Sequence, residues 1–185
     1  MKLVKLTGVR GVGKTSIIEE LKVDSEIVAS IGFIHSSKEL TKLSFEICKR
    51  PLESLSGEDL FRVQEALIRN TKNMPQKIVV FDTHNVKIEQ KTGKVIILTP
   101  YEHRKVFDCY ILIEAEPEVI MARRQADNNM KRDHNLELIV TEINAEREES
   151  RQMAAETGAN LYIVKNNVIS GAAEEIKRIL RREFE

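Results

Sequence analysis

The feature that most constrains this chain is a glycine-rich segment, TGVRGVGKTS, at residues 7–16. It contains the pattern G-x-x-x-x-G-K-[ST], in which Gly8, Gly13, Lys14 and Thr15 occupy the fixed positions. The apolar run LVKLT precedes it and an amphipathic helical pattern follows, which is the strand–loop–helix context that this motif requires. Successive N–H groups of such a loop point into one concavity, and the helix N-terminus adds partial positive charge. The sequence therefore predicts that the chain binds a nucleoside triphosphate.

Specific residues of this segment and of a later strand have predicted roles. The loop residues expected to bind ATP are Gly8, Val9, Arg10, Gly11, Val12, Gly13, Lys14, Thr15 and Ser16. Lys14 is expected to reach the β- and γ-phosphates, and the Thr15 hydroxyl is expected to coordinate Mg²⁺. The run KIVVFDTH supplies a second acidic element, because Asp82 follows four apolar residues and can hold Mg²⁺ through water. His84 is expected either to contact substrate or to fill the strand end.

Short β-branched runs alternate with longer helical patterns along the chain. Strands are predicted at residues 3–7, 26–31, 77–82, 109–114 and 160–165, and helices at residues 13–22, 38–49, 57–73, 117–125, 136–157 and 170–183. Most of these strands are almost continuously hydrophobic, which is typical of parallel strands covered on both faces. The predicted fold class is therefore α/β, a three-layer sandwich of the P-loop NTPase type with a five-stranded parallel sheet.

Turn and cap residues mark several expected boundaries. Ser56 and Ser170 are predicted N-caps, and Gly158 after AAET is a predicted helix stop. Pro117 suits the first turn of a helix, where proline is tolerated. The segment KTGK at residues 91–94 is expected to be the turn of a small hairpin.

Length, charge and cysteine content limit the classes of protein to which this chain could belong. A chain of 185 residues is sufficient for one domain, and a single kinase domain over residues 1–185 is expected. The 29 basic residues are balanced by 29 acidic ones, so overall charge gives no reason to expect a nucleic-acid partner. The two cysteines form no C-x-x-C pair, and no run approaches the ~20 apolar residues that a bilayer crossing needs. We expect a cytoplasmic protein without a membrane partner.

Missing motifs narrow the class of nucleotide-binding protein. The last predicted strand is followed by VKNNVIS, which lacks the acidic residue of a guanine-reading [NT]-K-x-D motif. The acidic strand continues as DTHN, so the glycine of a GTPase D-x-x-G motif is also missing. Motor ATPases usually have longer chains or more than one module. A compact kinase, in which a small acceptor binds opposite the triphosphate, is the remaining interpretation.

A basic segment after the fourth predicted strand suits such a kinase. In MARRQADNNMKRDHN, Arg123 and Arg124 end a predicted helix and Arg132 follows a polar loop. Arginine forks match phosphate oxygens, and they are most effective in a closed site that excludes water. Residues 123–135 are therefore predicted to form a lid, whose arginines act with Lys14 as catalytic cations. The alternative is a solvated basic helix end.

The segments TGVRGVGKTS, VVFDTH, LIEAEPEVIMARRQAD, KRDHN and GANLYIVKN, in this order, resemble the archaeal type of adenylate kinase. The resemblance implies the reaction of MgATP with AMP to give two ADP, a sheet ordered 2-3-1-4-5, and an assembly that is often a trimer. It also implies that Arg123 and Arg132 correspond to lid arginines. Asn166 lies where the family's adenine-contacting loop falls.

The acceptor-binding region, residues 32–75, departs from the family pattern. The family usually has an arginine in a Met-Arg-Lys-Leu-like segment that holds the AMP phosphate, and here LESLSGED places Glu53 near that position. Arg50 and Arg62 are the candidate replacements. Three interpretations remain open: an adenylate kinase, a P-loop kinase for a different small acceptor, and a slow ATPase that acts as a nucleotide-dependent regulatory or assembly factor.

Overall fold

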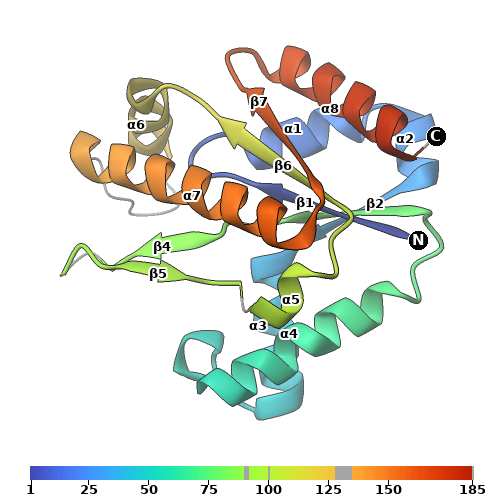
Figure 1. Cartoon of the computed structure of the whole chain (residues 1–185), viewed down its shortest axis with the longest axis vertical. Helices are drawn as coiled ribbons and strands as arrows, with labels where there is room; N and C mark the ends of the chain where they lie inside the picture. The colour runs from blue at the N-terminus through green and yellow to red at the C-terminus, as the bar shows by residue number, and fades with distance from the viewer. Residues whose placement is uncertain (90–91, 100, 128–134, 185) are drawn as a thin grey trace.

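The computed structural model of the chain describes residues 1–89, 92–99, 101–127 and 135–184, and its centre is a five-stranded parallel sheet (Figure 1). The strands of this sheet are β1 (Lys2–Thr7), β2 (Ile31–His35), β3 (Ile78–Asp82), β6 (Cys109–Glu114) and β7 (Asn160–Lys165). Their order is β2-β3-β1-β6-β7. Counted within the sheet alone, this order is 2-3-1-4-5, so the predicted fold class and strand order are confirmed.

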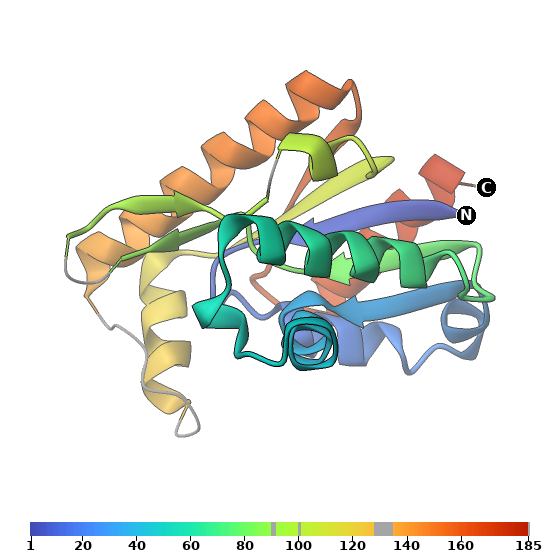
Figure 2. The ribbon, with the colours of Figure 1, turned by 90° about the horizontal axis from the view of Figure 1, so that it is seen from below.

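Helices cover both faces of the sheet (Figure 2). They are α1 (Lys14–Leu21), α2 (Ser25–Ser30), α3 (Ser36–Cys48), α4 (Gly57–Thr71), α5 (Tyr101–Arg104), α6 (Pro117–Ala126), α7 (Leu136–Thr157) and α8 (Ile169–Phe184), with a short 3₁₀ helix, η1 (Leu52–Ser54). Helices α1 and α8 pack on one face, where Val4 and Leu6 of β1 are buried. Helices α3 and α4 pack on the other face, together with Leu3. Because side chains alternate along a strand, Lys5 shares this second face with Leu3.

A small hairpin extends beyond the end of β3. It consists of β4 (Val86–Ile88) and β5 (Val95–Ile97), which pair antiparallel. Gly93, in the turn, has a φ of 69°, a left-handed value that glycine adopts readily. The predicted hairpin is thereby confirmed, although residue 91 of its expected turn lies outside the described residues. None of the helices in the described ranges combines the length and hydrophobicity that a bilayer crossing requires.

The strand predicted at residues 26–31 is wrong. Most of this segment forms helix α2, because the Asp24 carboxylate caps it by accepting hydrogen bonds from the backbone N–H groups of Glu26 (3.0 Å) and Ile27 (3.4 Å). The strand begins only at Ile31 and continues through IGFIH, where it pairs in register with β3. At this segment the helix cap outweighs the strand propensity of the β-branched residues.

The remaining predicted boundaries are close to the observed ones. Ser56 caps α4 by accepting a hydrogen bond from the Asp59 N–H (3.3 Å), and Pro117 occupies the first turn of α6. Gly158 ends α7 with a φ of 70°. Ser170 is the exception, because α8 begins at Ile169 and Ser170 therefore lies inside the helix.

Candidate active site

Two neighbouring cavities open at the carboxyl ends of the parallel strands. The first, of about 680 Å³, is here called the phosphate cleft, and it lies along the glycine-rich loop between β1 and α1. The second, of about 440 Å³, is called the inner cavity, and it lies between the sheet, α3, α4 and the segment after β5. Four residues line both cavities: Arg10, Ser37, Thr83 and His84. The two cavities therefore adjoin at these residues, and two molecules bound one in each cavity would lie next to each other.

Glycines give the loop its curvature. Gly8 has a φ of 143°, and a Cβ at this position would lie 2.5 Å from the carbonyl oxygen of Ile113. Gly13 has a φ of 103°, and a Cβ there would collide with the side-chain amide of Asn166. Seven of the nine predicted loop residues line the phosphate cleft, and the other two, Gly8 and Val12, are buried. The loop thus presents a concave backbone that a side chain would obstruct.

The structure brings the predicted lysine, hydroxyl and carboxylate to one cleft. The Lys14 ammonium lies over the loop and donates hydrogen bonds to the carbonyl oxygens of Gly8 and Val9. Thr15 is exposed at the start of α1, and Asp82 faces the same cleft from the end of β3. One carboxylate oxygen of Asp82 lies 2.9 Å from Nδ1 of His35, at the end of β2. Thr15 and Asp82 thus supply a hydroxyl and a carboxylate, the donor set that Mg²⁺ would need beside a triphosphate.

Arg123 and Asn166 hold the middle of the loop. The Val12 carbonyl oxygen accepts hydrogen bonds from Arg123 Nη1 and from Asn166 Nδ2, both at 2.7 Å. The second bond fixes the orientation of the Asn166 amide, because only its nitrogen can donate to a carbonyl. Asn166 is buried, and its Oδ1 has no hydrogen-bond partner among the described residues. This buried acceptor at the wall of the cleft is available for a ligand N–H.

Arg124, next to Arg123 on α6, lies in a different environment. Its side chain is buried, its Nε donates to the Arg10 carbonyl oxygen (3.0 Å), and it forms an ion pair with Glu142 of α7. Arg124 therefore supports the loop from behind. The structure does not bring it to the phosphate cleft beside Arg123, and the third predicted lid arginine, Arg132, lies outside the described residues.

Arg10 and His84 meet where the two cavities adjoin. Arg10 Nη2 lies 3.4 Å from His84 Nε2, and the Arg10 side chain is exposed to both cavities. Burial, together with the nearby positive charges of Lys14 and Arg10, lowers the pKa of His84 to about 3. The imidazole is therefore neutral at physiological pH, so it tolerates the neighbouring guanidinium instead of repelling it.

The two candidate acceptor arginines lie elsewhere. Arg50 and Arg62 both pair with Asp59 on the surface of α4, and neither lines the phosphate cleft or the inner cavity. Glu53, in η1, does line the inner cavity. The structure thus places the unexpected carboxylate beside the cavity and the two arginines outside it.

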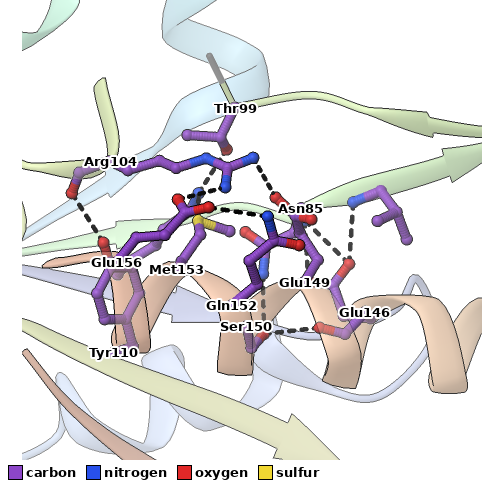
Figure 3. Close-up of polar contacts among 12 residues, drawn as sticks. Asn85, Thr99, Arg104, Tyr110, Glu146, Glu149, Ser150, Gln152, Met153 and Glu156 are labelled. Atoms are coloured by element: carbon purple, nitrogen blue, oxygen red, sulfur yellow. Dashed lines mark hydrogen bonds and ion pairs between the residues drawn. The ribbon is translucent and has the colours of Figure 1, made fainter. Parts of the chain in front are cut away.

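Sequence reasoning missed a buried carboxylate under the loop. Glu146 of α7 is 1% exposed, and it accepts hydrogen bonds from the Thr7 hydroxyl and the Gly8 N–H. It also accepts from the backbone N–H groups of Asn85 and Val86, at 2.9 and 3.0 Å (Figure 3). One carboxylate therefore ties the start of the phosphate loop to the segment after β3. Its signal in sequence is faint, because the partners are more than fifty residues away.

The loop between β1 and α1, the carboxylate at the end of β3 and the parallel sheet together define the P-loop kinase fold. A crystal structure of shikimate kinase from Bacteroides thetaiotaomicron is similar, with a TM-score of 0.59 and 12% identity over 97% of this chain and 98% of that one. The structure of TT1252 from Thermus thermophilus gives a TM-score of 0.55 and 15% identity over 100% of this chain and 98% of that one. At these identities, the likeness shows the fold alone.

Adenylate kinases are similar in sequence over nearly the whole chain. The adenylate kinase of Thermoplasma volcanium is 28% identical over 195 residues, which cover 95% of this chain and 98% of the relative. That of Methanocaldococcus jannaschii is 29% identical over 190 residues, which cover 97% and 98%. No protein-family model matches the chain. The resemblance found in the sequence is confirmed, and the homology supports a phosphotransferase of the P-loop type.

Proposed function

We propose that the protein is a nucleoside monophosphate kinase that transfers the γ-phosphoryl group of MgATP to AMP. The observation that carries this proposal is the junction of two cavities at Arg10 and His84, one built around a phosphate loop and one whose surface is mainly apolar. A hydrolase needs room for a water molecule, whereas a second cavity of about 440 Å³ is sufficient for an organic acceptor. The adenylate kinase relatives support AMP as that acceptor.

The residues of the phosphate cleft suit MgATP. The loop amides and Lys14 would hold the β- and γ-phosphates, and Asn166 Oδ1 would accept a hydrogen bond from the adenine amino group. Thr15 and Asp82 would hold Mg²⁺, which would neutralise charge on the phosphate oxygens. Arg123 would approach the phosphates once its bond to the Val12 carbonyl is exchanged for a phosphate oxygen.

Arg10 takes the place of the missing acceptor arginine in this proposal. It stands at the junction of the cavities, where the AMP phosphate must approach the γ-phosphoryl group. Its main chain is anchored by Arg124, and its guanidinium lies beside the neutral imidazole of His84. A positioned guanidinium at this point would align the two anionic groups and screen their repulsion.

The transfer itself requires no covalent intermediate with the protein. An oxygen of the AMP phosphate attacks the γ-phosphorus, the bond to the β,γ-bridging oxygen breaks, and ADP leaves with the electron pair. Both products are ADP. Catalysis is then positional and electrostatic, with the charges of Lys14 and Arg10 placed around the transferred group. The lid at residues 123–135 and the trimer implied by the family resemblance remain predictions.

A second candidate keeps the kinase and changes the acceptor. Glu53 lines the inner cavity, where a carboxylate would repel an anionic acceptor that lay close to it. An acceptor with a hydroxyl or amino group at that position would suit Glu53 better. A panel of acceptors, comprising AMP, GMP, CMP, UMP and the corresponding nucleosides, separates this candidate from the first.

The test is the initial rate of ADP formation from MgATP, with and without AMP, for the wild type and Lys14→Ala. We expect AMP-dependent ADP formation that Lys14→Ala slows by roughly 10²–10⁴-fold, the scale of losing one charge-stabilising group. Phosphotransfer that survives Lys14→Ala would contradict the assignment. Transfer to another member of the panel, with none to AMP, would favour the second candidate.

A further inference from the structure

Lys5 is a lysine in the middle of the central strand, where the neighbouring strands carry apolar side chains. It is 1% exposed, pairs in register with Phe81 of β3, and lines the floor of the inner cavity. Lysine is almost never fully buried unless its charge is paired. The question is therefore what its ammonium group binds.

The polar partners of Lys5 are few. Its Nζ donates to the Thr99 hydroxyl at 2.5 Å and approaches the Met153 sulfur at 3.6 Å, which are both drawn in Figure 3. The Phe107 ring centroid lies 5.5 Å away. Within the described part of the chain, Lys5 forms no ion pair, and an ammonium has three N–H donors. At least one donor is thus left for a ligand.

The nearby buried carboxylates are already committed to other donors. Glu146 accepts hydrogen bonds from Thr7 and from three backbone N–H groups. Glu149 pairs with Arg104 at 2.5 Å, and Arg104 also binds Glu156 at 2.7 Å (Figure 3). These carboxylates reduce the electrostatic cost of burying Lys5 but do not bind its ammonium group. Within the described residues, the Lys5 ammonium is therefore buried without a carboxylate bound to it.

The position of Lys5 relative to the phosphate loop suggests what it binds. Lys5 lies three residues before Gly8, so their Cα atoms are about 10 Å apart at the usual rise per residue of a strand. Arg10 and Lys5 both line the inner cavity, so an acceptor whose phosphate lies at Arg10 and whose body fills this cavity can place another part of the molecule at Lys5. Gln64 of α4, Thr99 and Phe107 also line the inner cavity, and none of the three lines the phosphate cleft. Their polar and aromatic groups suit a planar heterocycle.

We propose that Lys5 is a specificity-determining residue, which donates a hydrogen bond to a lone pair on the base of the acceptor nucleotide. The inference rests on the proposed function, because it takes the inner cavity as the acceptor site. The base would replace Thr99 as the partner of Lys5 or bind beside it. Burial lowers the pKa of Lys5 to about 7, against the opposing effect of Glu146 and Glu149. The bond survives this shift, because the neutral amine also has N–H donors.

The experiment compares AMP with its 1-deaza, 3-deaza and 7-deaza analogues, each of which lacks one ring nitrogen. We expect the wild type to prefer AMP over one of these analogues by about 10- to 100-fold in kcat/KM, the scale of leaving one buried donor without its acceptor. Lys5→Met should remove this preference and leave the KM for ATP unchanged. Lys2→Met is the matched control, because Lys2 lies on the same strand, is exposed, and lines neither cavity.

Several outcomes overturn the inference. It is wrong if Lys5→Met retains the preference of the wild type, or if the wild type does not discriminate among the four nucleotides. Methionine has a similar length and no charge to bury, so Lys5→Met is expected to fold. Circular dichroism and thermal unfolding verify this, and a variant that does not fold is replaced by Lys5→Gln.

Failure of the proposed function gives a different pattern. If ATP transfers no phosphoryl group to any nucleotide, binding of AMP is measured by calorimetry instead. AMP that binds without turnover, and binds more weakly to Lys5→Met, would support the inference while the kinase assignment fails. AMP that binds equally to both proteins, or to neither, would overturn the inference.

Discussion

The stability prediction for Glu146 is specific, because its buried carboxylate is the acceptor for one hydroxyl and three backbone N–H groups. Four donors converge on it: the Thr7 hydroxyl and the backbone N–H groups of Gly8, Asn85 and Val86. In Glu146→Gln the side chain keeps its shape but exchanges one acceptor oxygen for an NH₂ group. That NH₂ must then face either the Thr7–Gly8 pair or the Asn85–Val86 pair, and at least one buried N–H loses its acceptor.

The expected cost follows from these lost bonds. An unsatisfied buried donor costs about 1–3 kcal/mol, and the bonds that remain lose the strength that the charge gave them. We therefore expect Glu146→Gln to lower the free energy of unfolding by about 2–4 kcal/mol. For a chain of this length this corresponds to a fall in Tm of roughly 5–15 °C.

The assay is urea and thermal unfolding near pH 8, with Glu148→Gln as the matched control. Glu148 lies two residues away on the same helix, carries the same charge, and is exposed. Its substitution should change the free energy of unfolding by less than about 0.5 kcal/mol. Equal effects of the two substitutions would refute the account of Glu146 as the tie between β1, the phosphate loop and the segment after β3.

Two further predictions concern the junction of the cavities and the buried lysine. Arg10→Ala should raise the KM for AMP by about 10- to 100-fold with a smaller effect on the KM for ATP, whereas the exposed Arg151→Ala should change neither; equal effects on the two substrates would contradict the role given to Arg10. Burial lowers the pKa of Lys5 to about 7 from its ordinary 10.5, so between these pH values the unfolded chain binds more protons than the folded one. The free energy of unfolding should therefore rise by a few kcal/mol as pH increases through this range, relative to Lys5→Met in the same urea titrations, and parallel pH profiles for the two proteins would argue against a perturbed Lys5.

Local patterns in the sequence predicted the phosphate loop and the parallel strands because the causes of these features are local, whereas the strand order followed from the family resemblance. The spacing from Gly8 to Thr15 fixes a loop conformation, and continuous hydrophobic runs mark strands covered on both faces. The strand predicted at residues 26–31 shows the limit of this reasoning. One Asp24 cap, two residues before that range, selects a helix, and the apolar run that follows provides the strand.

Tertiary contacts decide the parts of the site that sequence reasoning missed. Arg123 and Arg124 are adjacent residues of the same type, so the sequence does not distinguish their roles. Neighbouring side chains on a helix point about 100° apart, and Arg123 therefore lies at the cleft while Arg124 pairs with Glu142. The partners of Glu146 lie in two segments distant from α7 in sequence. Lys5 did leave a signal, since it interrupts an otherwise apolar strand, but the cavity beside it is formed by helices that only the fold brings together.

The most direct test of the central claim follows the γ-phosphoryl group of ATP in a single turnover. ATP radiolabelled at the γ-phosphate is mixed with an excess of the protein, Mg²⁺ and AMP, and the products are separated by chromatography. The account predicts that the label appears in ADP, on the phosphate transferred to AMP, and that Lys14→Ala slows its appearance. Label that appears only as inorganic phosphate, at a rate independent of AMP and of every other acceptor in the panel, would contradict the account and indicate an ATPase.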